Sequence, residues 1–252
     1  MIAKLKRQSP MTEQSGFLLV YKPAGITSHD VVDRIRRITG IKKVGHAGTL
    51  DPFATGLLII GIGRNATREL SHLLGLSKQY EATFLLGAKS DTDDVTGTIE
   101  HTPVHPDAFP EEKTIRETMG LFTGIIEQIP PDYAAIKIGG KKFYELARAG
   151  KTIPKKPRTL HIYEYELLAY KQPKIVVHIY CSSGTYIRAL ARDLGEQLEI
   201  GAYVETLKRL SIGPFSLKEA KTLEEIAQEK WSDHLFPIET VMKKISSFSP
   251  PF

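Results

Sequence analysis

One acidic residue, Asp51, stands in a glycine-rich stretch with the composition of a loop. From Gly45 to Gly56 the chain carries three glycines and one proline, and Asp51 is the only acid there. Pro52 disfavours the α conformation for the residue before it, and glycines let a ligand approach the backbone closely. These features would present the Asp51 carboxylate as a nucleophile or general base. Aspartate is also a standard turn residue, so a simple turn cap is the alternative.

A second stretch, Cys181–Arg188, passes from strand-forming to small and then to helix-forming residues. We expect Arg188 in the first turn of a helix, where the helix dipole disfavours a cation unless an anion lies nearby. A pair between Arg188 and Asp51 would keep the carboxylate ionised, because a neighbouring guanidinium favours the charged form of an acid. The alternative is that Arg188 and Arg192, four residues apart, form a basic helix face in solvent.

The segment from residue 137 to 158 is strongly basic, with eight cations against a single acid, Glu145. The cations are Lys137, Lys141, Lys142, Arg148, Lys151, Lys155, Lys156 and Arg158. Glycine, proline and the aromatic residues Phe143 and Tyr144 are interspersed among them. This composition suits a loop that binds a nucleic-acid phosphate backbone with a few stacked bases. A charged loop in solvent is the alternative.

Hydrophobic patterning predicts the elements that must position these groups. Runs of apolar, aromatic and β-branched residues predict strands at 17–21, 57–62, 80–86, 160–170 and 174–181, the last two as an antiparallel pair. Helices are predicted at 28–39, with Ser28 as N-cap, at 114–122, at 187–198 and after a capping box at Thr222. Residues 44–56 are predicted to be a loop. We therefore expect an α+β (mixed α/β) domain around one largely antiparallel mixed sheet.

The composition, 41% apolar and 25% charged over 252 residues, is that of a globular protein and excludes a disordered or fibrous chain. The single cysteine, Cys181, allows no internal disulfide, and no apolar run approaches the roughly 20 residues of a membrane span. We expect a cytoplasmic protein that does not enter membranes. The acidic run Asp91–Asp94 and the pair His101 and His105 lack the spacing of calcium and zinc sites, so no metal is expected.

Four motifs, in order along the chain, resemble those of the TruB family of tRNA pseudouridine synthases. The first is Lys22–Ser28, and the second, Gly45–Gly56, resembles the catalytic motif of the family. The third comprises Tyr80, Gly87 and Asp91–Asp94, and the fourth comprises Ser183–Arg188 with Leu194 and Gly195. The resemblance runs from about Gly16 to Pro214 and implies a single pseudouridine-synthase-type catalytic domain.

The resemblance implies isomerisation of uridine 55 in the T loop of tRNA to pseudouridine, without cofactor or metal. Asp51 would be the nucleophile: the bond from N1 to C1′ breaks, the uracil turns, and C5 rejoins C1′. A single carboxylate suits this reaction better than the two acids of a glycoside hydrolase, because water must stay out. The alternative from another class is a non-catalytic RNA chaperone or tRNA-binding module that uses the same basic surface.

The resemblance also assigns roles to further side chains. Tyr80 would stack on the target base and could take part in proton transfer at C5, and Arg188 would pair with the nucleophile. Tyr186 would close the pocket, and His46 would fill the gap left by a nucleotide that swings out of its stack. Leu207 would pack on the substrate base, whereas its pattern alone predicts a leucine in a helix core.

The same resemblance sets the expected organisation of the chain. Residues 1–15 are expected to be a basic flexible tail and residues 16–245 the catalytic domain. The basic segment falls within an insertion, about 125–160, that corresponds to the RNA-clamping thumb of the family. The C-terminal PUA domain of longer family members is expected to be absent. The expected partner is the T-arm stem-loop of tRNA, bound by a monomer.

Overall fold

A nine-stranded sheet runs through the computed structural model, which describes residues 14–103, 105, 108–131, 137–138, 141–142 and 156–250. Its central path is, in order, β1 (Gly16–Lys22), β3 (Thr55–Ile62), β12 (Ala202–Ile212), β4 (Lys78–Leu86), β11 (Lys174–Cys181), β10 (Arg158–Lys171) and β7 (Gly124–Gln128). Strand β2 (Val44–Ala47) pairs with β3, and β13 (Phe215–Ser216) pairs with β12. Strands β12 and β3 are parallel, and the other described pairings are antiparallel, so the sheet is mixed and largely antiparallel.

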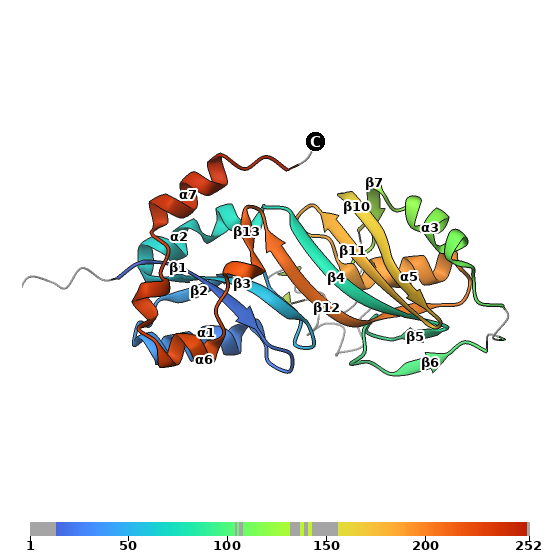
Figure 1. The fold of residues 1–252 in the computed structure, drawn as a ribbon, viewed down its shortest axis with the longest axis horizontal. Coiled ribbons are helices and arrows are strands. Elements are labelled where there is room, and N and C mark those ends of the chain that lie inside the picture. Colours follow the sequence, from blue (N-terminus) through green and yellow to red (C-terminus); the bar gives the residue numbers. More distant parts are fainter. Residues whose placement is uncertain are drawn as a thin grey trace, which may run out of the picture.

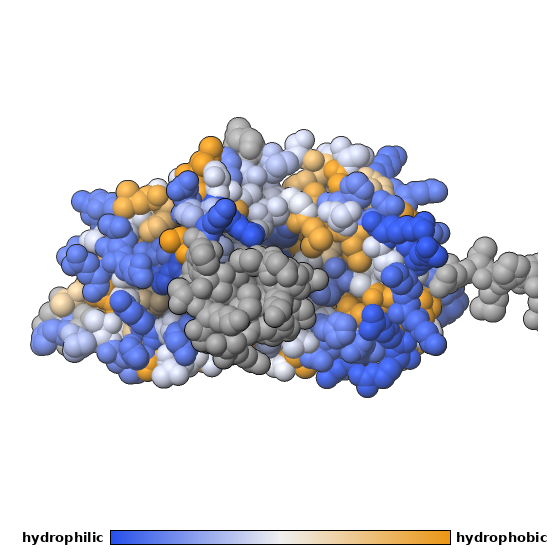
Figure 2. Space-filling view, turned by 180° about the vertical axis from the view of Figure 1, so that it is seen from behind, coloured by the Kyte–Doolittle hydropathy of each residue, from blue (hydrophilic) through white to orange (hydrophobic). Residues whose placement is uncertain are grey.

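The helices lie on both faces of this sheet (Figure 1). They are α1 (Ser28–Thr39), α2 (Gly63–Leu74), α3 (Glu112–Gly120), α5 (Ile187–Gln197), α6 (Leu223–Gln228) and α7 (Ile238–Ser246), with short 3-10 helices at Leu217–Glu219 and Trp231–His234. Two small hairpins complete the described elements: β5 (Ala88–Ser90) with β6 (Ile99–His101), and β8 (Lys137–Ile138) with β9 (Lys141–Lys142). No helix in these ranges is long and apolar enough to cross a bilayer. Figure 2 shows many hydrophilic side chains on the described part of the rear face, with apolar ones scattered among them.

Strands β1 and β3 are buried on both faces, which explains why their apolar runs do not alternate with polar residues. Leu18, Leu58 and Ile60 belong to a core cluster with residues of α1 and α6. Leu57 and Ile59 belong to a second cluster, with residues of α2 and α7. Figure 1 shows these helix pairs on opposite sides of the two strands. This double cover gives the loop between β2 and β3 a fixed support.

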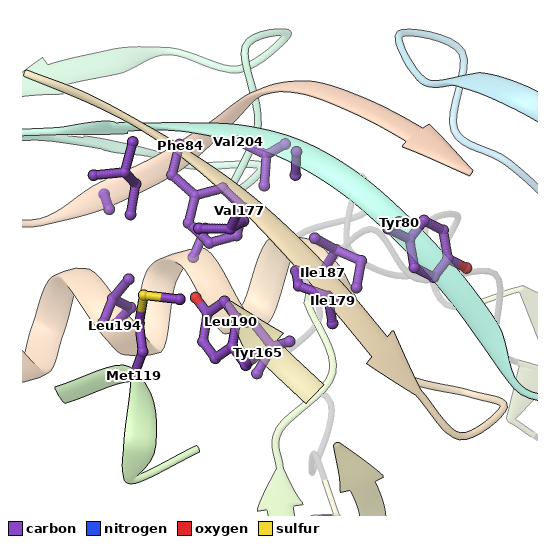
Figure 3. Close-up of a cluster of buried hydrophobic side chains, with 14 of the residues drawn as sticks. Tyr80, Phe84, Met119, Tyr165, Val177, Ile179, Ile187, Leu190, Leu194 and Val204 are labelled. Carbon is purple, nitrogen blue, oxygen red and sulfur yellow. The ribbon is translucent and has the colours of Figure 1, made fainter. Parts of the chain in front are cut away.

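The remaining half of the sheet is covered on one face by α3 and α5 (Figure 3). Phe84 and Val177 on the strands pack in one cluster with Met119 of α3 and Leu190 of α5. Tyr80 belongs to the same cluster and lies toward its edge in Figure 3. The core therefore ends at a tyrosine that the sequence predicts to be functional.

The structure confirms the five predicted strands and the antiparallel pairing of the strands at 160–170 and 174–181. Helix α1 is also present, but Ser28 is not its N-cap. The cap is Thr27, whose hydroxyl accepts a hydrogen bond from the Asp30 N–H at 3.0 Å within a capping box. The Ser28 hydroxyl is instead bound to the backbone of Leu50, because Ser28 is buried against the loop that carries Asp51.

The sequence patterning misses several elements, among them α2, α7, β7 and β12, and β2 occupies the start of the predicted 44–56 loop. The interpretation of Leu207 as a helix-core residue from its pattern alone is wrong, because Leu207 lies on β12. There Leu207 and Arg209 are buried while Lys208 between them is partly exposed, which is the period of a strand. At the N-terminus, Ser15 already contacts the fold, since its hydroxyl donates to the Ile62 carbonyl and accepts from the Ala66 N–H.

Candidate active site

A cavity of about 250 Å³ opens where the loop between β2 and β3, the start of β4, the turn between β11 and α5, and β12 come together. Five of the predicted site residues line it: Asp51, Tyr80, Tyr186, Arg188 and Leu207. The fold thus brings to one place residues that come from four separate parts of the chain.

The backbone on both sides of Asp51 is held by side chains from the first helix and strand. Before it, the Ser28 hydroxyl accepts a hydrogen bond from the Leu50 N–H at 2.9 Å and donates one to the Leu50 carbonyl at 3.1 Å. After it, the Lys22 ammonium donates to the Pro52 carbonyl at 3.2 Å. Burial lowers the pKa of Lys22 to about 8. Because these peptide groups are bonded to the body of the fold, the loop presents Asp51 in a defined position.

Arg188 lies between two carboxylates. Its Nε is 3.0 Å from Asp51 Oδ2, and its Nη1 is 3.2 Å from Asp94 Oδ2. The side chains of Arg188 and Asp94 are 5% and 4% exposed, whereas that of Asp51 is 35% exposed. The predicted ion pair is therefore present, and the alternative of a solvated Arg188 is wrong. Asp94 was not predicted as a site residue, although it ends the third motif.

The rest of the acidic run also serves α5. Arg192, on the same helix, donates through Nη1 to Asp93 at 3.0 Å and through Nη2 to Asp193 at 2.7 Å. Arg192 is also only partly exposed, so the proposed solvated basic face is absent. Among the described residues, no group of three or more His, Cys, Asp or Glu side chains could hold a metal ion. Within this run, Asp93 and Asp94 are partners for arginine, whereas Asp91 accepts a hydrogen bond from the Thr98 N–H at 2.8 Å.

The pKa of Asp51 is raised above its ordinary value, mainly because burial disfavours the charged carboxylate. Arg188 lowers this pKa and Asp94 raises it. The sequence prediction that Arg188 favours the ionised form of Asp51 is confirmed, because the guanidinium lowers this pKa. The net pKa is nevertheless raised, because burial and the second acid, Asp94, outweigh the effect of Arg188. A water-accessible third of the side chain limits this desolvation while the cavity is open.

A second buried arginine, Arg209, stands beside Tyr80. The two residues are directly opposite each other in the pairing of β12 with β4, and both line the cavity. Arg209 is 1% exposed, and its charge acts on the neighbouring Tyr80 phenol. It also donates through Nε to the Leu57 carbonyl at 2.8 Å and through Nη2 to the Gly48 carbonyl at 3.1 Å. The sequence patterning missed Arg209, because its role depends on the register of two strands far apart in the chain.

Tyr186 is held at the start of α5 by a buried amide from the far edge of the sheet. Gln128, 1% exposed at the end of β7, accepts a hydrogen bond from the Tyr186 N–H at 2.9 Å and donates one to its carbonyl at 3.1 Å. Tyr186 is the N-cap residue of α5 and has no capping side chain of its own. Gln128 therefore fixes the turn that leads into Arg188, and sequence analysis did not identify it.

His46 is the one predicted substrate-binding residue that is not among the described lining residues of the cavity. It lies on β2, two residues before Gly48, which does line the cavity. Its imidazole is partly buried, and burial, followed by the charge of Arg209, lowers its pKa and favours the neutral ring. The geometry thus places His46 beside the cavity.

The basic segment lies largely outside the described residues. The predicted RNA-binding residues with a described position are Lys137 on β8, Lys141 and Lys142 on β9, Lys156, and Arg158 at the start of β10. Of these, Lys156 and Arg158 have described side chains, and both are exposed. Arg148, Lys151 and Lys155 lie outside the described residues, as do residues 1–13 of the predicted basic tail.

Comparison with known proteins agrees with this geometry. Residues 36–187 match the N-terminal domain of TruB family pseudouridylate synthases, and residues 188–244 match the C-terminal domain of tRNA pseudouridylate synthase B. The tRNA pseudouridine synthase B of Arthrobacter sp. (strain FB24) is 44% identical over 221 residues, which are 85% of this chain and 71% of that protein. The enzyme of the same name from Syntrophobacter fumaroxidans is 41% identical over 241 residues, 94% of this chain and 78% of that protein.

A solved structure shows the same fold. The structure described as a Cbf5-Nop10-Gar1 complex contains a chain that matches with a TM-score of 0.72 and 28% sequence identity. The match covers 95% of the present chain and 65% of that chain. Two domain matches that together span most of the chain, and relatives above 40% identity over most of their length, decide the assignment. This chain belongs to the TruB family of pseudouridylate synthases.

Proposed function

We propose that this protein isomerises uridine to pseudouridine in tRNA, and that its target is uridine 55 in the T arm. The observation that carries the proposal is the Asp51 carboxylate, held against Arg188 at 3.0 Å on the wall of a small cavity. Membership of the TruB family and the names of the relatives support tRNA as the substrate. The T-arm position rests on the resemblance of the catalytic motif to that family.

The reaction needs one nucleophile and an enclosed space. The bond between N1 and C1′ breaks, the uracil turns, and a bond between C5 and C1′ forms, while C5 loses a proton and N1 gains one. No atom of water enters the product, so the site must hold the detached base away from solvent. A cavity of about 250 Å³ is at the small end of ligand pockets and suits a single base.

The side chains around the cavity divide this work. Asp51 would be the nucleophile, and Arg188 would bind its carboxylate and stabilise the ionised form needed for attack. Tyr80 and Leu207, both nearly buried on neighbouring strands, would form apolar walls for the base. Tyr186, held by Gln128, would close the side of the cavity at the start of α5.

The target base must leave the T-loop stack before it can enter the cavity, which costs a few kcal/mol. His46, beside the cavity on β2, is placed to occupy the vacated position in the stack. Exposed cations such as Lys156 and Arg158 would bind phosphates and offset part of this cost. Replacing these two residues by alanine should weaken tRNA binding and flatten its salt dependence, with little change in single-turnover chemistry.

We also propose that the enzyme acts as a monomer in the cytoplasm. A single cysteine, buried at Cys181, is consistent with a reducing compartment.

The test is release of tritium from a T-arm stem-loop labelled at C5 of its uridines. The wild-type protein should release tritium from the intact substrate and none from a stem-loop whose target uridine is replaced by cytidine. Asp51→Asn should bind the same RNA with similar affinity and release none. If the wild-type protein binds the stem-loop but releases no tritium, the proposed reaction is refuted and a non-catalytic tRNA-binding function takes its place. Free uracil in the reaction would instead indicate a hydrolase.

A further inference from the structure

The guanidinium of Arg209 joins three parts of the candidate site. Its Nε donates to the carbonyl of Leu57 on β3, inside the doubly covered end of the sheet. Its Nη2 and Nη1 reach the carbonyls of Gly48 and Thr49, at 3.1 and 3.5 Å, in the loop that carries Asp51. Its charge also acts on the phenol of Tyr80, which lies directly opposite Arg209 in the pairing of β12 with β4. One rigid, planar group thus connects the core, the catalytic loop and the catalytic tyrosine.

The two strands beside Arg209 fix the position of its backbone. Arg209 lies opposite Tyr80 on one side and opposite Gly56 on the other, in the parallel pair of β12 with β3. A Cβ atom at Gly56 would lie 2.3 Å from the Arg209 carbonyl oxygen, so only glycine allows this approach. The position of Arg209 is therefore set by its neighbours, and its side chain enters the cavity wall at a fixed point.

Arg209 carries a charge that has no carboxylate partner in the part of the chain that the structure describes. Its hydrogen bonds go to carbonyl groups, and the Tyr80 phenol lies on the opposite strand. Arg188 differs, since it contacts two acids. Burying a cation without a counter-ion is unfavourable, and burial accordingly lowers the pKa of Arg209. Such a residue is expected where negative charge develops during a reaction.

We propose that Arg209 is a positioning residue for the isomerisation: it holds the Tyr80 side chain in a fixed place beside the Asp51 loop and supplies the positive charge that stabilises the phenolate form of Tyr80, which takes the proton from C5. The inference rests on the proposed function. In the step concerned, the C5–H bond of the rotated base breaks, its electron pair remains in the uracil ring, and the proton passes to the phenolate oxygen of Tyr80. The phenol then loses this proton to solvent, where tritium from C5 is detected.

The electrostatics of Tyr80 agree with this assignment. Burial raises the pKa of the phenol above its ordinary value, and Arg209 opposes this rise by its charge. Asp51 acts in the other direction, because a negative charge nearby disfavours the phenolate. Removing the charge of Arg209 should therefore move the titration of Tyr80 to higher pH.

Two variants separate the charge of Arg209 from its geometry. Arg209→Gln retains a hydrogen-bond donor and removes the charge, whereas Arg209→Lys retains the charge and removes the planar group that bridges the carbonyls. The matched control is Lys78→Met, because Lys78 is another buried cation of the cavity wall whose ammonium is bound to the carbonyls of Leu74 and Leu76. Each variant is first checked for its melting temperature and its affinity for the T-arm stem-loop.

The readout is the single-turnover rate of C5 tritium release as a function of pH. For Arg209→Gln we expect a rate at least about 10-fold below wild type. The alkaline rising limb, which belongs to Tyr80 and is distinct from the acid limb of Asp51, should shift upward by about 1–3 pH units, the size expected when a charge next to a phenol is lost. For Arg209→Lys we expect a lower plateau with the limb close to its wild-type position. Lys78→Met should leave the limb in place.

The inference is overturned if both Arg209 variants keep the wild-type pH profile and lose rate only in proportion to the folded fraction, since that is the behaviour of a purely structural residue. It is also overturned if Lys78→Met shifts the limb as far as Arg209→Gln does. If the wild-type protein releases no tritium at any pH, the proposed function itself fails. These outcomes are distinguishable in one set of measurements.

Discussion

The amide of Gln128 gives a quantitative test of how the turn before α5 is held. Gln128→Ala removes two hydrogen bonds to the backbone of Tyr186, at 2.9 and 3.1 Å. Since Tyr186 is partly exposed, water can replace part of what is lost, and each bond counts at its net value of about 0.5–1.5 kcal/mol. The expected loss of unfolding free energy is therefore about 1–3 kcal/mol. For a chain of this size, that lowers the melting temperature by about 2–12 °C.

The same change should slow catalysis, because the turn held by Gln128 leads directly into Tyr186 and Arg188. A displacement of about 1 Å at a reacting group can cost 100-fold in rate, so we expect single-turnover tritium release to fall by about 10- to 100-fold. Affinity for the stem-loop should change little. Gln128→Glu should retain the bond from the Tyr186 N–H and lose the bond to its carbonyl, giving an intermediate effect.

Gln197 provides the matched control, since it is an exposed glutamine at the end of α5, the helix that follows the turn. Gln197→Ala should leave melting temperature and rate near wild type. If Gln128→Ala behaves like Gln197→Ala in both measurements, the two hydrogen bonds do not hold the turn and the reasoning is refuted.

Three further substitutions and one pH profile test the other contacts of the site. The tritium-release rate of the wild type should fall as the pH drops through the raised pKa of Asp51, so its midpoint should lie above the value of about 3.9 for an ordinary aspartate. The folded protein binds the Asp51 proton more tightly than the unfolded chain, so its unfolding free energy should fall relative to that of Asp51→Asn as the pH rises from 4 to 7. Urea unfolding of both proteins at pH 4 and pH 7 measures this difference. An equal difference at the two pH values would contradict the prediction. Asp94→Asn should shift the acid limb of the rate to lower pH, because Arg188 then acts on Asp51 alone, and an unmoved limb would contradict the shared ion pair. Gly56→Ala, with φ at +108° and a Cβ only 2.3 Å from the Arg209 carbonyl oxygen, should lose at least about 1–3 kcal/mol of stability in the same urea assay.

Local sequence was sufficient for five strands of the sheet and for Asp51 and Arg188, whereas the other site residues were assigned by the family resemblance. The continuous apolar run Leu57–Ile62 predicts a buried strand, and in the structure helices cover both faces of that strand. The Gly45–Gly56 stretch predicts a presented acid, and Asp51 does line the cavity. A cation in the first turn of a helix predicts an anionic partner, and Arg188 has two. In each case the interaction that determines the structure acts between residues close in sequence or between opposite charges.

Residues that act through long-range register could not be predicted in this way. Arg209 contacts the Leu57 carbonyl across 152 positions of sequence, and Gln128 contacts Tyr186 across 58. Strand β12 also carries register shifts, between Val204 and Thr206 and between Arg209 and Ser211 relative to β4. Such shifts decide which side chains face the cavity, and no local pattern in the sequence encodes them.

The protonation of Asp51 shows why identifying an ion pair from sequence does not determine its electrostatic effect. The pair with Arg188 is correctly predicted and lowers the pKa of the acid as expected, yet the net pKa is raised because burial outweighs the pair. The Arg188 guanidinium stabilises ionised Asp51 less when it also binds a second carboxylate, and it binds that of Asp94 at 3.2 Å. Burial then decides the sign, because the fold that brings Arg188 to Asp51 also removes most of its water. A substrate base that closes the cavity would remove more water from Asp51. The reactivity of Asp51 therefore depends on the substrate as well as on Arg188.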